Sequence, residues 1–232
     1  MKTVIIAAGA GSRLMSRRPK TLLQFGNGTI LSTIIENMKR TAISDIVIVV
    51  GFEGEQIREY IAIHKQFQVN IEFVENPQWK RGNGISVLAV KEAVGKNPFL
   101  LSMSDHIVSV AAIDRIKNYN SDHNLLLVDP KIEGIFDIDD ATKVMVNHQR
   151  IVDIGKEITR YNAIDCGLFR LTPRFFDAMA QQSKIGRESI SAGVQKLIEI
   201  EDMEAVFLEK DDFWIDIDTP ESYQYAQQNF IK

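Results

Sequence analysis

A glycine-rich loop with basic side chains lies near the start of the chain. The loop supplies six candidate phosphate contacts, which are Ala8, Gly9, Gly11, Ser12, Arg13 and Lys20. Glycine lets backbone N–H groups approach a phosphate closely, and such groups form a natural anion nest. Because the arginine and the lysine add positive charge, the loop predicts a site for a polyanion such as a triphosphate.

The spacing of this loop excludes two common kinds of nucleotide site. A dinucleotide-binding fingerprint needs a third glycine, but Leu14 stands at that position. A Walker loop needs a Gly-Lys-Ser/Thr sequence, which is also absent from the loop. The structural alternative is a glycine turn followed by a solvated basic run.

Three carboxylates beside other apolar runs have the spacing of a cation site. Asp105 stands just past the apolar run at residues 99–103, and Asp216 and Asp218 lie two positions apart in an expected strand. Side chains two apart on a strand face the same side, and two bare carboxylates repel unless a cation or donors lie between them. Mg²⁺ is usually held by one or two carboxylates together with phosphates and water. These residues therefore predict a Mg²⁺ site, although Asp105 and Asp218 could also cap a turn or a helix.

The elements that position these residues are predicted from apolar periodicity. Buried strands are expected at residues 4–8, 46–50, 69–74 and 99–103, with helices at 30–38, 53–64 and 85–94. Near-continuous Val/Ile/Leu strands separated by helices indicate a parallel sheet covered on both faces. Loops after such strands form the ligand-binding edge of the sheet, which is where Gly9 and Asp105 fall.

The second half of the chain has a less regular pattern. It predicts strands at residues 125–128, 143–146, 151–154 and 164–171, helices at 173–181 and 189–199, a late strand pair at 205–208 and 214–217, and a last helix from Pro220. We expect an α/β fold, a Rossmann-like mixed, mostly parallel sheet with helices on both faces and extra antiparallel strands in the C-terminal half. Residues 1–232 are expected to form a single domain, with a nucleotide-binding part at about 1–107 and an acceptor-binding part at about 108–232.

The bulk composition excludes several classes of protein. The formal net charge is −4, whereas a nucleic-acid binder usually shows a basic excess, so no nucleic-acid partner is expected. No apolar run reaches the ~20 residues of a membrane span, so no membrane insertion is expected. The single cysteine, Cys166, excludes an intrachain disulfide, and together with an N-terminus that lacks an export signal it predicts a cytoplasmic location.

The glycine loop and the Pro19-Lys20 pair resemble the signature of the nucleoside diphosphate-sugar pyrophosphorylase and cytidylyltransferase superfamily. The resemblance implies that the loop holds a nucleoside triphosphate and that Lys20 contacts it. It also implies that Gly82, Asn83 and Gly84 border the nucleotide base. A simple turn with a helix cap is the structural alternative for these three residues.

The same resemblance assigns the predicted metal site. Asp105 matches a metal ligand of the superfamily. The second ligand resembles Asp216 in the sugar-nucleotide branch and Asp218 in the phosphocholine and keto-sugar-acid branches. We favour Asp218 as the direct ligand and Asp216 as a co-ligand or supporting residue, because Thr219 can cap the helix that starts at Pro220 equally well.

Motifs along nearly the whole chain resemble one branch of the superfamily, the CTP:inositol-1-phosphate cytidylyltransferases. The motifs are ArgGlyAsnGly (81–84), SerAspHis (104–106), AlaThrLysVal (141–144), IleGlyLys (154–156) and TrpIleAspIleAspThr (214–219). This branch implies that CTP and a small phosphorylated alcohol, inositol 1-phosphate, react to give CDP-inositol and pyrophosphate. It implies that Thr142, Lys156 and Asp165 bind the acceptor. Arg13, Lys20 and Lys156 are then the expected catalytic residues.

Two departures from this branch bear on the acceptor. Arg81 stands where many members have lysine, and the two are not equivalent at a bidentate site. The 232 residues also do not include the membrane-embedded phosphotransferase domain to which the activity is often fused. A homodimer is a further option, since oligomers are common in the superfamily.

Other functions are left open by the sequence. The same reaction could use phosphocholine, a sugar 1-phosphate or a phosphonate, but residues 137–143 are polar and offer no aromatic cage, which favours a polyol. A dinucleotide-dependent oxidoreductase is disfavoured by the missing third glycine and by the Pro19-Lys20 pair. A catalytically silent nucleotide-binding regulator is disfavoured by the presence of the predicted catalytic residues.

The expected chemistry does not require a general base. The nucleophile is a phosphate whose second pKa is about 6, so it is already mostly ionised near neutral pH. The difficulty is to bring two polyanions together, which the metal and the three cationic side chains would make possible. His106 is therefore expected to shape the pocket and not to act as a base.

Overall fold

The structure is a computed structural model, and it describes residues 1–11, 13, 18–64 and 67–230. The first half of the chain alternates strands and helices, as the apolar pattern predicts. Its elements are β1 (Thr3–Ala7), η2 (Lys20–Leu22), β2 (Gln24–Phe25), β3 (Gly28–Thr29), α1 (Ile30–Arg40), β4 (Asp45–Val50), α2 (Gly54–Ile63), β5 (Asn70–Glu75), α3 (Asn83–Ala89), α4 (Lys91–Val94) and β6 (Phe99–Met103).

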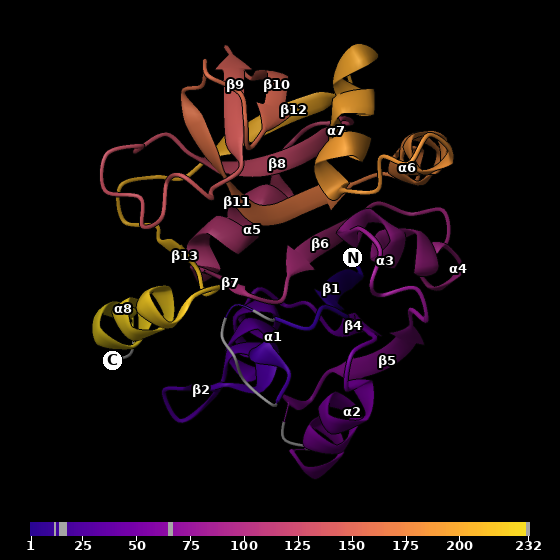
Figure 1. Cartoon of the computed structure of the whole chain (residues 1–232), viewed down its shortest axis with the longest axis vertical. Coiled ribbons are helices and arrows are strands. Elements are labelled where there is room, and N and C mark those ends of the chain that lie inside the picture. Colours follow the sequence, from indigo (N-terminus) through magenta and orange to yellow (C-terminus); the bar gives the residue numbers. More distant parts are fainter. Residues whose placement is uncertain (12, 14–17, 65–66, 231–232) are drawn as a thin grey trace.

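The second half adds strands and helices in a less regular order. Its elements are β7 (His106–Val108), α5 (Val110–Asn118), β8 (Asn124–Asp129), β9 (Lys143–Asn147), β10 (Arg150–Gly155), β11 (Ala163–Leu171), α6 (Arg174–Lys184), α7 (Ile190–Glu199), β12 (Met203–Phe207), β13 (Trp214–Asp216) and α8 (Pro220–Phe230). Figure 1 shows β8, β9, β10 and β12 gathered at one end of the molecule and α1, α2, β4 and β5 at the other.

One nine-stranded sheet runs through both halves, in the order β5-β4-β1-β6-β11-β8-β12-β10-β9. The strands β5, β4, β1 and β6 pair in parallel. The strand β11 is antiparallel to both β6 and β8, and β10 is antiparallel to both β12 and β9. Among the described strands of this sheet, β10 and β11 therefore run against the rest. The predicted mixed, mostly parallel sheet is confirmed.

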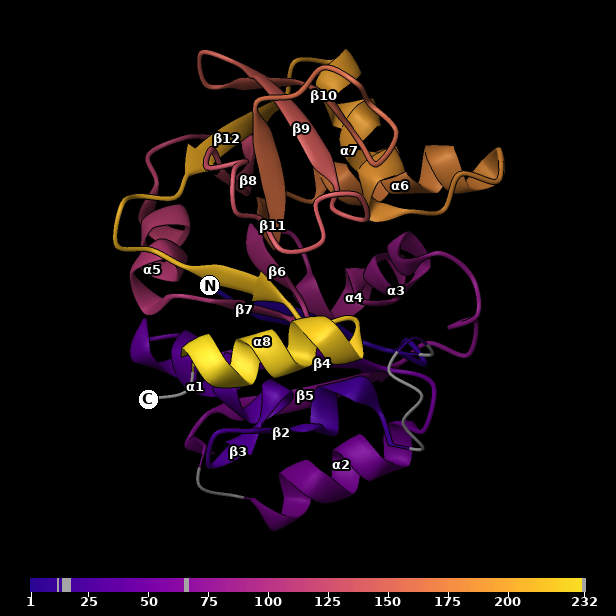
Figure 2. The ribbon, with the colours of Figure 1, turned by 60° about the vertical axis from the view of Figure 1, so that its left-hand side comes forward.

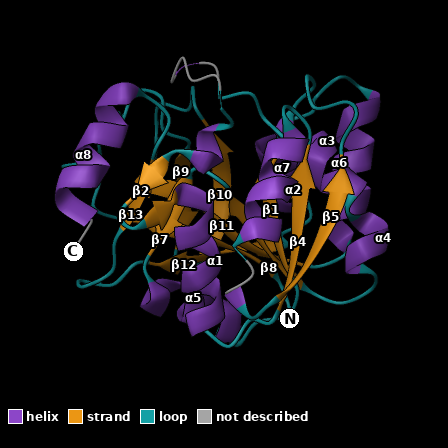
Figure 3. Ribbon diagram, turned by 90° about the horizontal axis from the view of Figure 1, so that it is seen from below, coloured by secondary structure: helices purple, strands orange, loops and turns teal. Residues whose placement is uncertain are grey.

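Helices cover both faces of the sheet because its strand residues alternate between two buried cores (Figure 3). On β1, Ile5 packs into the core beneath α1, α2, α5 and α8, while Val4 and Ile6 pack into the core beneath α3, α6 and α7. On β6, Leu100 and Leu101 divide in the same way. The predicted two-sided cover of the sheet is confirmed.

Several details differ from the predicted pattern. The helix expected over residues 85–94 is divided at Val90 into α3 and α4. The segments expected as a late strand pair do not pair with each other, because β12 joins the main sheet beside β8 while β13 pairs with β7. The elements β7 and α5 and the β2–β3 hairpin were not predicted, since short segments carry too little periodic signal.

The order of the strands creates a ligand-binding edge between β1 and β6. From β1 the chain moves outward through α1 to β4 and through α2 to β5, and then returns by α3 and α4 to β6 on the other side of β1. The connections therefore leave this point on opposite faces, which is the arrangement at which open α/β sheets bind ligands. Figure 2 shows α8 lying across the molecule in front of α1. None of the helices in the described ranges has the length and apolar character to cross a membrane.

Candidate active site

A cavity of about 420 Å³ opens beside the carboxyl ends of β1 and β6. The two halves of the chain both contribute to its walls. The first half contributes Gly9, Gly11, Arg13, Lys20, Trp79 and Asp105. The second half contributes Asp140, Thr142, Lys156, Asp165, Asp216 and Asp218. Most residues that the sequence singled out for chemistry therefore meet around one hollow.

Lys20 lies at the base of this cavity between two carboxylates. Its Nζ is 2.5 Å from Asp105 Oδ2 and 2.6 Å from Asp218 Oδ1. Gly11, with φ +57°, permits this placement, because a Cβ there would lie 2.6 Å from Lys20 Cβ. Gly11 of the glycine loop and the lysine that follows the loop are thus packed against each other.

The pKa values of this cluster favour its charged forms. Burial lowers the pKa of Lys20, but the charges of Asp105 and Asp218 outweigh burial and hold that pKa above its usual value. Burial raises the pKa of Asp105, but Lys20 and His106 outweigh it and hold the pKa well below its usual range. The base of the cavity therefore carries the Lys20 ammonium and the Asp105 carboxylate in their ionised forms at neutral pH.

His106 and Asp216 face each other because β7 and β13 pair with these two residues in register. His106 Nδ1 is 2.8 Å from Asp105 Oδ1 and 3.8 Å from Asp216 Oδ1, and its ring stacks on Trp214 at 5.7 Å. Burial lowers the pKa of His106, but Asp216 and Asp105 outweigh it and raise that pKa to about 9. A histidine that is already protonated at neutral pH cannot accept a proton.

Three side chains in this region bring possible metal-ligating atoms close to one another. The nearest ligating atoms of Asp105, His106 and Asp216 lie within 4.8 Å of one another. Asp216 Oδ1 is buried and has no hydrogen-bond partner among the described residues. Burial raises the pKa of Asp216 to about 6, because it disfavours the ionised carboxylate. A bound cation would stabilise that ionised form. The two carboxylates therefore fit a hard divalent cation, whereas the protonated ring of His106 has no lone pair to offer it.

Asp218 lies beside this cluster but is engaged differently. Its carboxylate forms ion pairs with both Lys20 and Arg13. It does not cap α8 in the structure, because Thr219 Oγ1 accepts from the backbone N–H of Ser222 and so caps the helix. The Asp218 carboxylate is therefore paired with the two cations of the cavity and is not used as a helix cap. Its assignment as the direct metal ligand stays a prediction.

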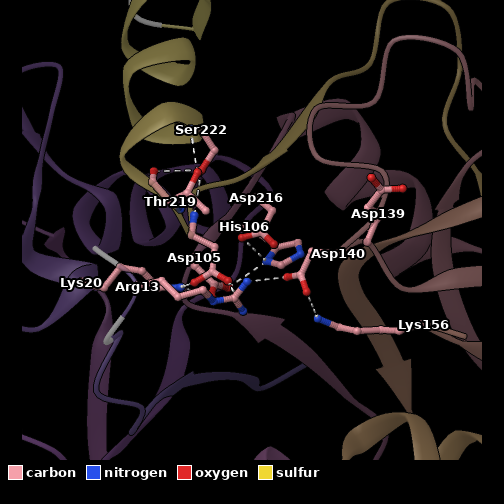
Figure 4. Close-up of polar contacts among 12 residues, drawn as sticks. Arg13, Lys20, Asp105, His106, Asp139, Asp140, Lys156, Asp216, Thr219 and Ser222 are labelled. Atoms are coloured by element: carbon pink, nitrogen blue, oxygen red, sulfur yellow. Dashed lines mark hydrogen bonds and ion pairs between the residues drawn. The ribbon is translucent and has the colours of Figure 1, made fainter. Parts of the chain in front are cut away.

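Arg13 and Lys156 approach each other across the cavity with a carboxylate between them. Arg13 Nη1 is 2.6 Å from Asp140 Oδ2, and Lys156 Nζ is 2.7 Å from Asp140 Oδ1 (Figure 4). Arg13 comes from the glycine loop, whereas Lys156 follows β10 and Asp140 lies in the loop between β8 and β9. The predicted triphosphate residue and the predicted acceptor residue are thus bridged by a single side chain.

The loop predicted to border the base is packed against the segment before α7. A Cβ at Gly82 would lie 2.3 Å from the backbone oxygen of Glu188, and a Cβ at Gly84 would lie 2.7 Å from the same atom. Asn83 Oδ1 accepts the backbone N–H of Ile190 at 2.8 Å, and Arg81 pairs with Glu188. Close packing against Glu188 therefore explains why glycine stands at positions 82 and 84. Arg81 and Asn83 line the cavity.

The remaining predicted residues occupy varied positions. Ala8 is buried and its carbonyl accepts the N–H of Phe52 at 3.0 Å, whereas Gly9 borders the cavity. Ser12 lies outside the described residues. Thr142 and Asp165 meet on the cavity wall, where the Thr142 carbonyl accepts the Asp165 N–H at 2.9 Å.

Asp140 and Trp79 are among the cavity residues that the sequence analysis did not single out. Asp140 is one of several acidic residues in the segment 137–140, and nothing in the pattern separates it from its neighbours. Trp79 lies in the cavity wall with its ring 5.4 Å from that of Phe52, but an aromatic residue before a turn carries no specific signal.

Comparison with known proteins assigns the chain to a family. The sequence profile of nucleotidyl transferases matches residues 2–232. The chain belongs to the nucleotidyl transferase family. The family predicted from the glycine loop is confirmed, and the alternative of a dinucleotide-dependent oxidoreductase loses its support.

Relatives of this nucleotidyl transferase include proteins with two activities. It is 30% identical over 234 residues to a bifunctional IPC transferase and DIPP synthase of Thermococcus kodakarensis, a match that covers 100% of this chain and 51% of the relative. It is 29% identical over 237 residues to the bifunctional protein GlmU of Methanococcus maripaludis, covering 100% of this chain and 54% of that one. The chain thus spans about half the length of these curated relatives.

Solved structures share the fold of this nucleotidyl transferase. An inositol-1-phosphate CTP transferase from T. maritima has a TM-score of 0.86 at 24% identity, covering 100% of this chain and 97% of the other. A UDP-glucose pyrophosphorylase from Acinetobacter baumanii has a TM-score of 0.83 at 17% identity, covering 99% and 93%. These likenesses confirm the predicted fold class.

Proposed function

We propose that this nucleotidyl transferase moves CMP from CTP to a phosphomonoester, inositol 1-phosphate, and releases pyrophosphate. The observation that carries the proposal is the meeting of Arg13 and Lys20 with Lys156 at one cavity, from opposite halves of the chain. Two separate sets of cations are what two polyanionic substrates need if they are to lie side by side. The names of the relatives point to the same substrates, because they include IPC transferases and an inositol-1-phosphate CTP transferase.

In the proposed reaction an acceptor phosphate oxygen attacks the α-phosphorus of CTP, and the bond from that phosphorus to the pyrophosphate oxygen breaks. Arg13 and Lys20 hold the triphosphate, while Lys156 holds the acceptor phosphate. The acceptor phosphate is mostly ionised near neutral pH because its second pKa is about 6. The raised pKa of His106 supports this scheme, since a protonated imidazole does not serve as a base.

Mg²⁺ is proposed as the cofactor, held by Asp105 and Asp218 with Asp216 as a co-ligand. A hard cation of this kind neutralises charge on phosphate oxygens as they react. The orphaned Asp216 Oδ1 supports a cation at this place. Lys20 forms ion pairs with both Asp105 and Asp218, so the two carboxylates are held in place before substrate arrives.

The acceptor side of the cavity suits a polyol phosphate. The residues around Lys156 include Thr142 and Asp165, whose polar side chains can bind hydroxyl groups. The exposed ring of Phe136 also reaches this wall, but it stacks on Tyr225 at 5.1 Å and does not form a cage with other rings. Phosphocholine, a sugar 1-phosphate and a phosphonate are the acceptors against which the proposal has to be compared.

The test is pyrophosphate release measured over the four nucleoside triphosphates and a panel of acceptors with Mg²⁺. The expected result is highest kcat/KM for CTP with inositol 1-phosphate, and loss of turnover when Mg²⁺ is chelated. Higher kcat/KM with phosphocholine or glucose 1-phosphate would keep the reaction and replace the acceptor. Absence of pyrophosphate release with every pair would contradict the proposed reaction itself.

A further inference from the structure

Asp140 occupies a place that is electrostatically unexpected in a phosphate-binding enzyme. Its two carboxylate oxygens take one cation each, with Oδ2 on Arg13 at 2.6 Å and Oδ1 on Lys156 at 2.7 Å. A carboxylate beside phosphates repels them, so a fixed negative charge here works against the binding of two polyanionic substrates. The position therefore needs an explanation that the proposed reaction does not give.

The geometry of the bridge matches what a substrate phosphate would make. A phosphate presents several oxygens on one centre, so two of them can reach the same pair of cations that Asp140 now joins. Asp140 also offsets the charge of Lys156 and part of the charge of Arg13, which keeps a second ion pair with Asp218, and the two cations come from different halves of the chain. Asp140 thus makes, from within the protein, the contacts expected of a phosphate that lies between Arg13 and Lys156.

We propose that Asp140 occupies the place of a substrate phosphate in the substrate-free enzyme. A phosphate then has to displace Asp140 from the two cations in order to bind, so Asp140 sets the affinity for phosphate. The inference rests on the proposed function, since that function places phosphates at Arg13 and Lys156. It makes Asp140 a specificity-determining residue, because a ligand has to replace the bridge before it can use either cation fully.

The exposure of the bridge makes such an exchange feasible. The side chains of Arg13, Asp140 and Lys156 are 51%, 37% and 47% exposed, so water screens their ion pairs. Exposed ion pairs are weak, and a multiply charged ligand can therefore replace them. The pairs of Lys20 with Asp105 and Asp218 differ, because those side chains are only 11–17% exposed.

The loop that carries Asp140 is held at points on either side of that residue. It connects β8 to β9, and the ring of Phe136 holds its middle on Tyr225 of α8. At its far end Lys143 Nζ donates to the carbonyls of Asp139 and Lys156 at 3.3 and 2.9 Å. These fixed points lie on either side of Asp140, so its side chain can turn away while the ends of the loop keep their places.

The experiment compares two variants that each remove one negative charge from the same loop. Asp140→Asn removes the bridge and keeps the side-chain shape. Asp139→Asn is the matched control, because Asp139 is exposed and points away from Arg13 and Lys156 (Figure 4). Binding of inorganic pyrophosphate to the full chain at fixed Mg²⁺ is measured by calorimetry, and thermal unfolding is followed in parallel.

We expect Asp140→Asn to bind pyrophosphate about fivefold more tightly than the wild type, given two exposed ion pairs that no longer compete. The affinity of Asp139→Asn for pyrophosphate should stay within about twofold of the wild-type affinity. This variant measures the general effect of removing one negative charge from the loop. The difference between the two variants should shrink at high salt, since the lost pairs are exposed.

Equal or weaker pyrophosphate binding by Asp140→Asn relative to Asp139→Asn would overturn the inference. A merely structural bridge would instead lower the unfolding temperature of Asp140→Asn and leave affinity unchanged, which also counts against it. If the wild type itself does not bind pyrophosphate, the proposed function fails. If it binds and the two variants agree, only the role of Asp140 fails.

Discussion

At the residue scale, each cation of the site forms ion pairs with particular carboxylates. Lys20 is buried between Asp105 and Asp218, whereas Lys156 is half exposed and pairs with Asp140. Both lysines line the cavity, but two largely buried ion pairs hold the first in place, whereas a single exposed ion pair holds the second. This difference predicts different consequences for their removal, with the larger structural cost at Lys20.

Lys156→Ala should reduce turnover without unfolding the chain. Loss of one electrostatic stabiliser typically costs about 10²–10³ in rate, and removal of a half-exposed side chain has little effect on stability. Steady-state pyrophosphate release and thermal unfolding are the measurements. Lys184→Ala, which removes an exposed lysine at the end of α6, is the matched control. Near-normal turnover of Lys156→Ala would contradict the assignment of Lys156 to the acceptor site.

Asp165→Asn should stabilise the protein relative to the wild type at high pH but not at low pH. Burial raises the pKa of Asp165 from 3.8 to about 6, although the Gly167 N–H and His106 partly offset it. The folded state therefore carries no penalty below pH 3.8, and the penalty grows until the carboxylate is fully ionised above pH 6.

The expected gain for Asp165→Asn is about 1 kcal/mol at pH 8 and close to zero at pH 4, a modest value because the residue is not fully enclosed. Denaturant unfolding of both proteins at the two pH values measures it, and Asp139→Asn serves as the exposed control. A gain of equal size at both pH values would show that ionisation of Asp165 is not its cause.

At the element scale, short strands do most of the positioning. The pairing of β7 with β13 sets His106 opposite Asp216, and β11 passes directly beneath the histidine. Gly167 of β11 has φ +71°, and a Cβ there would lie 2.4 Å from His106 Cδ2. Gly167 is therefore required both for its backbone conformation and for the space that His106 occupies, and it packs the second half of the chain against His106.

Gly167→Ala should therefore lower both stability and turnover. The control is Gly186→Ala, since Gly186 has φ +78° but no described atom lies within 4 Å of its Cβ position. Backbone strain alone should cost about 1–2 kcal/mol at Gly186. Gly167→Ala should cost more, because His106 has to shift as well. Denaturant unfolding and pyrophosphate release measure both effects, and identical costs at the two glycines would refute the packing argument.

The elements also show where prediction from sequence succeeds. The strands β1, β4, β6 and β11 are long, apolar runs, and each was placed within one or two residues. The strand β7 covers only three residues, so it has no period to detect. Its pairing partner β13 was found as a strand, but its place in a separate small sheet depends on contacts between distant segments.

At the scale of the whole molecule, the sheet brings the two halves of the site together. The strand β6 pairs with β1 on one side and with β11 on the other, so residues after β1 and β6 meet residues from the second half. The formal net charge of −4 provides no general attraction for CTP, and binding depends on local cations. Substrate binding should consequently be sensitive to salt and to Mg²⁺.

CTP with Mg²⁺ should stabilise the whole fold. A ligand that binds only the native state at 100 times its Kd adds about 2.7 kcal/mol to the free energy of unfolding. For a chain of this size that corresponds to a rise in Tm of roughly 5–10 °C. Differential scanning calorimetry with CTP and with GTP at equal concentration is the measurement. A larger shift with GTP, or an equal shift after chelation of Mg²⁺, would contradict the proposed nucleotide or cofactor.

The sequence by itself determined the α/β class, and it predicted the phosphate-binding loop and most of the charged residues that line the cavity. These follow from local causes, since apolar periodicity sets the strands and glycine with lysine sets the loop chemistry. Only the tertiary structure decided that Lys20 lies between Asp105 and Asp218, that His106 is charged, and that Asp140 bridges Arg13 and Lys156. Such pairs join residues far apart in the chain, and their burial and mutual charge exist only once the sheet has assembled.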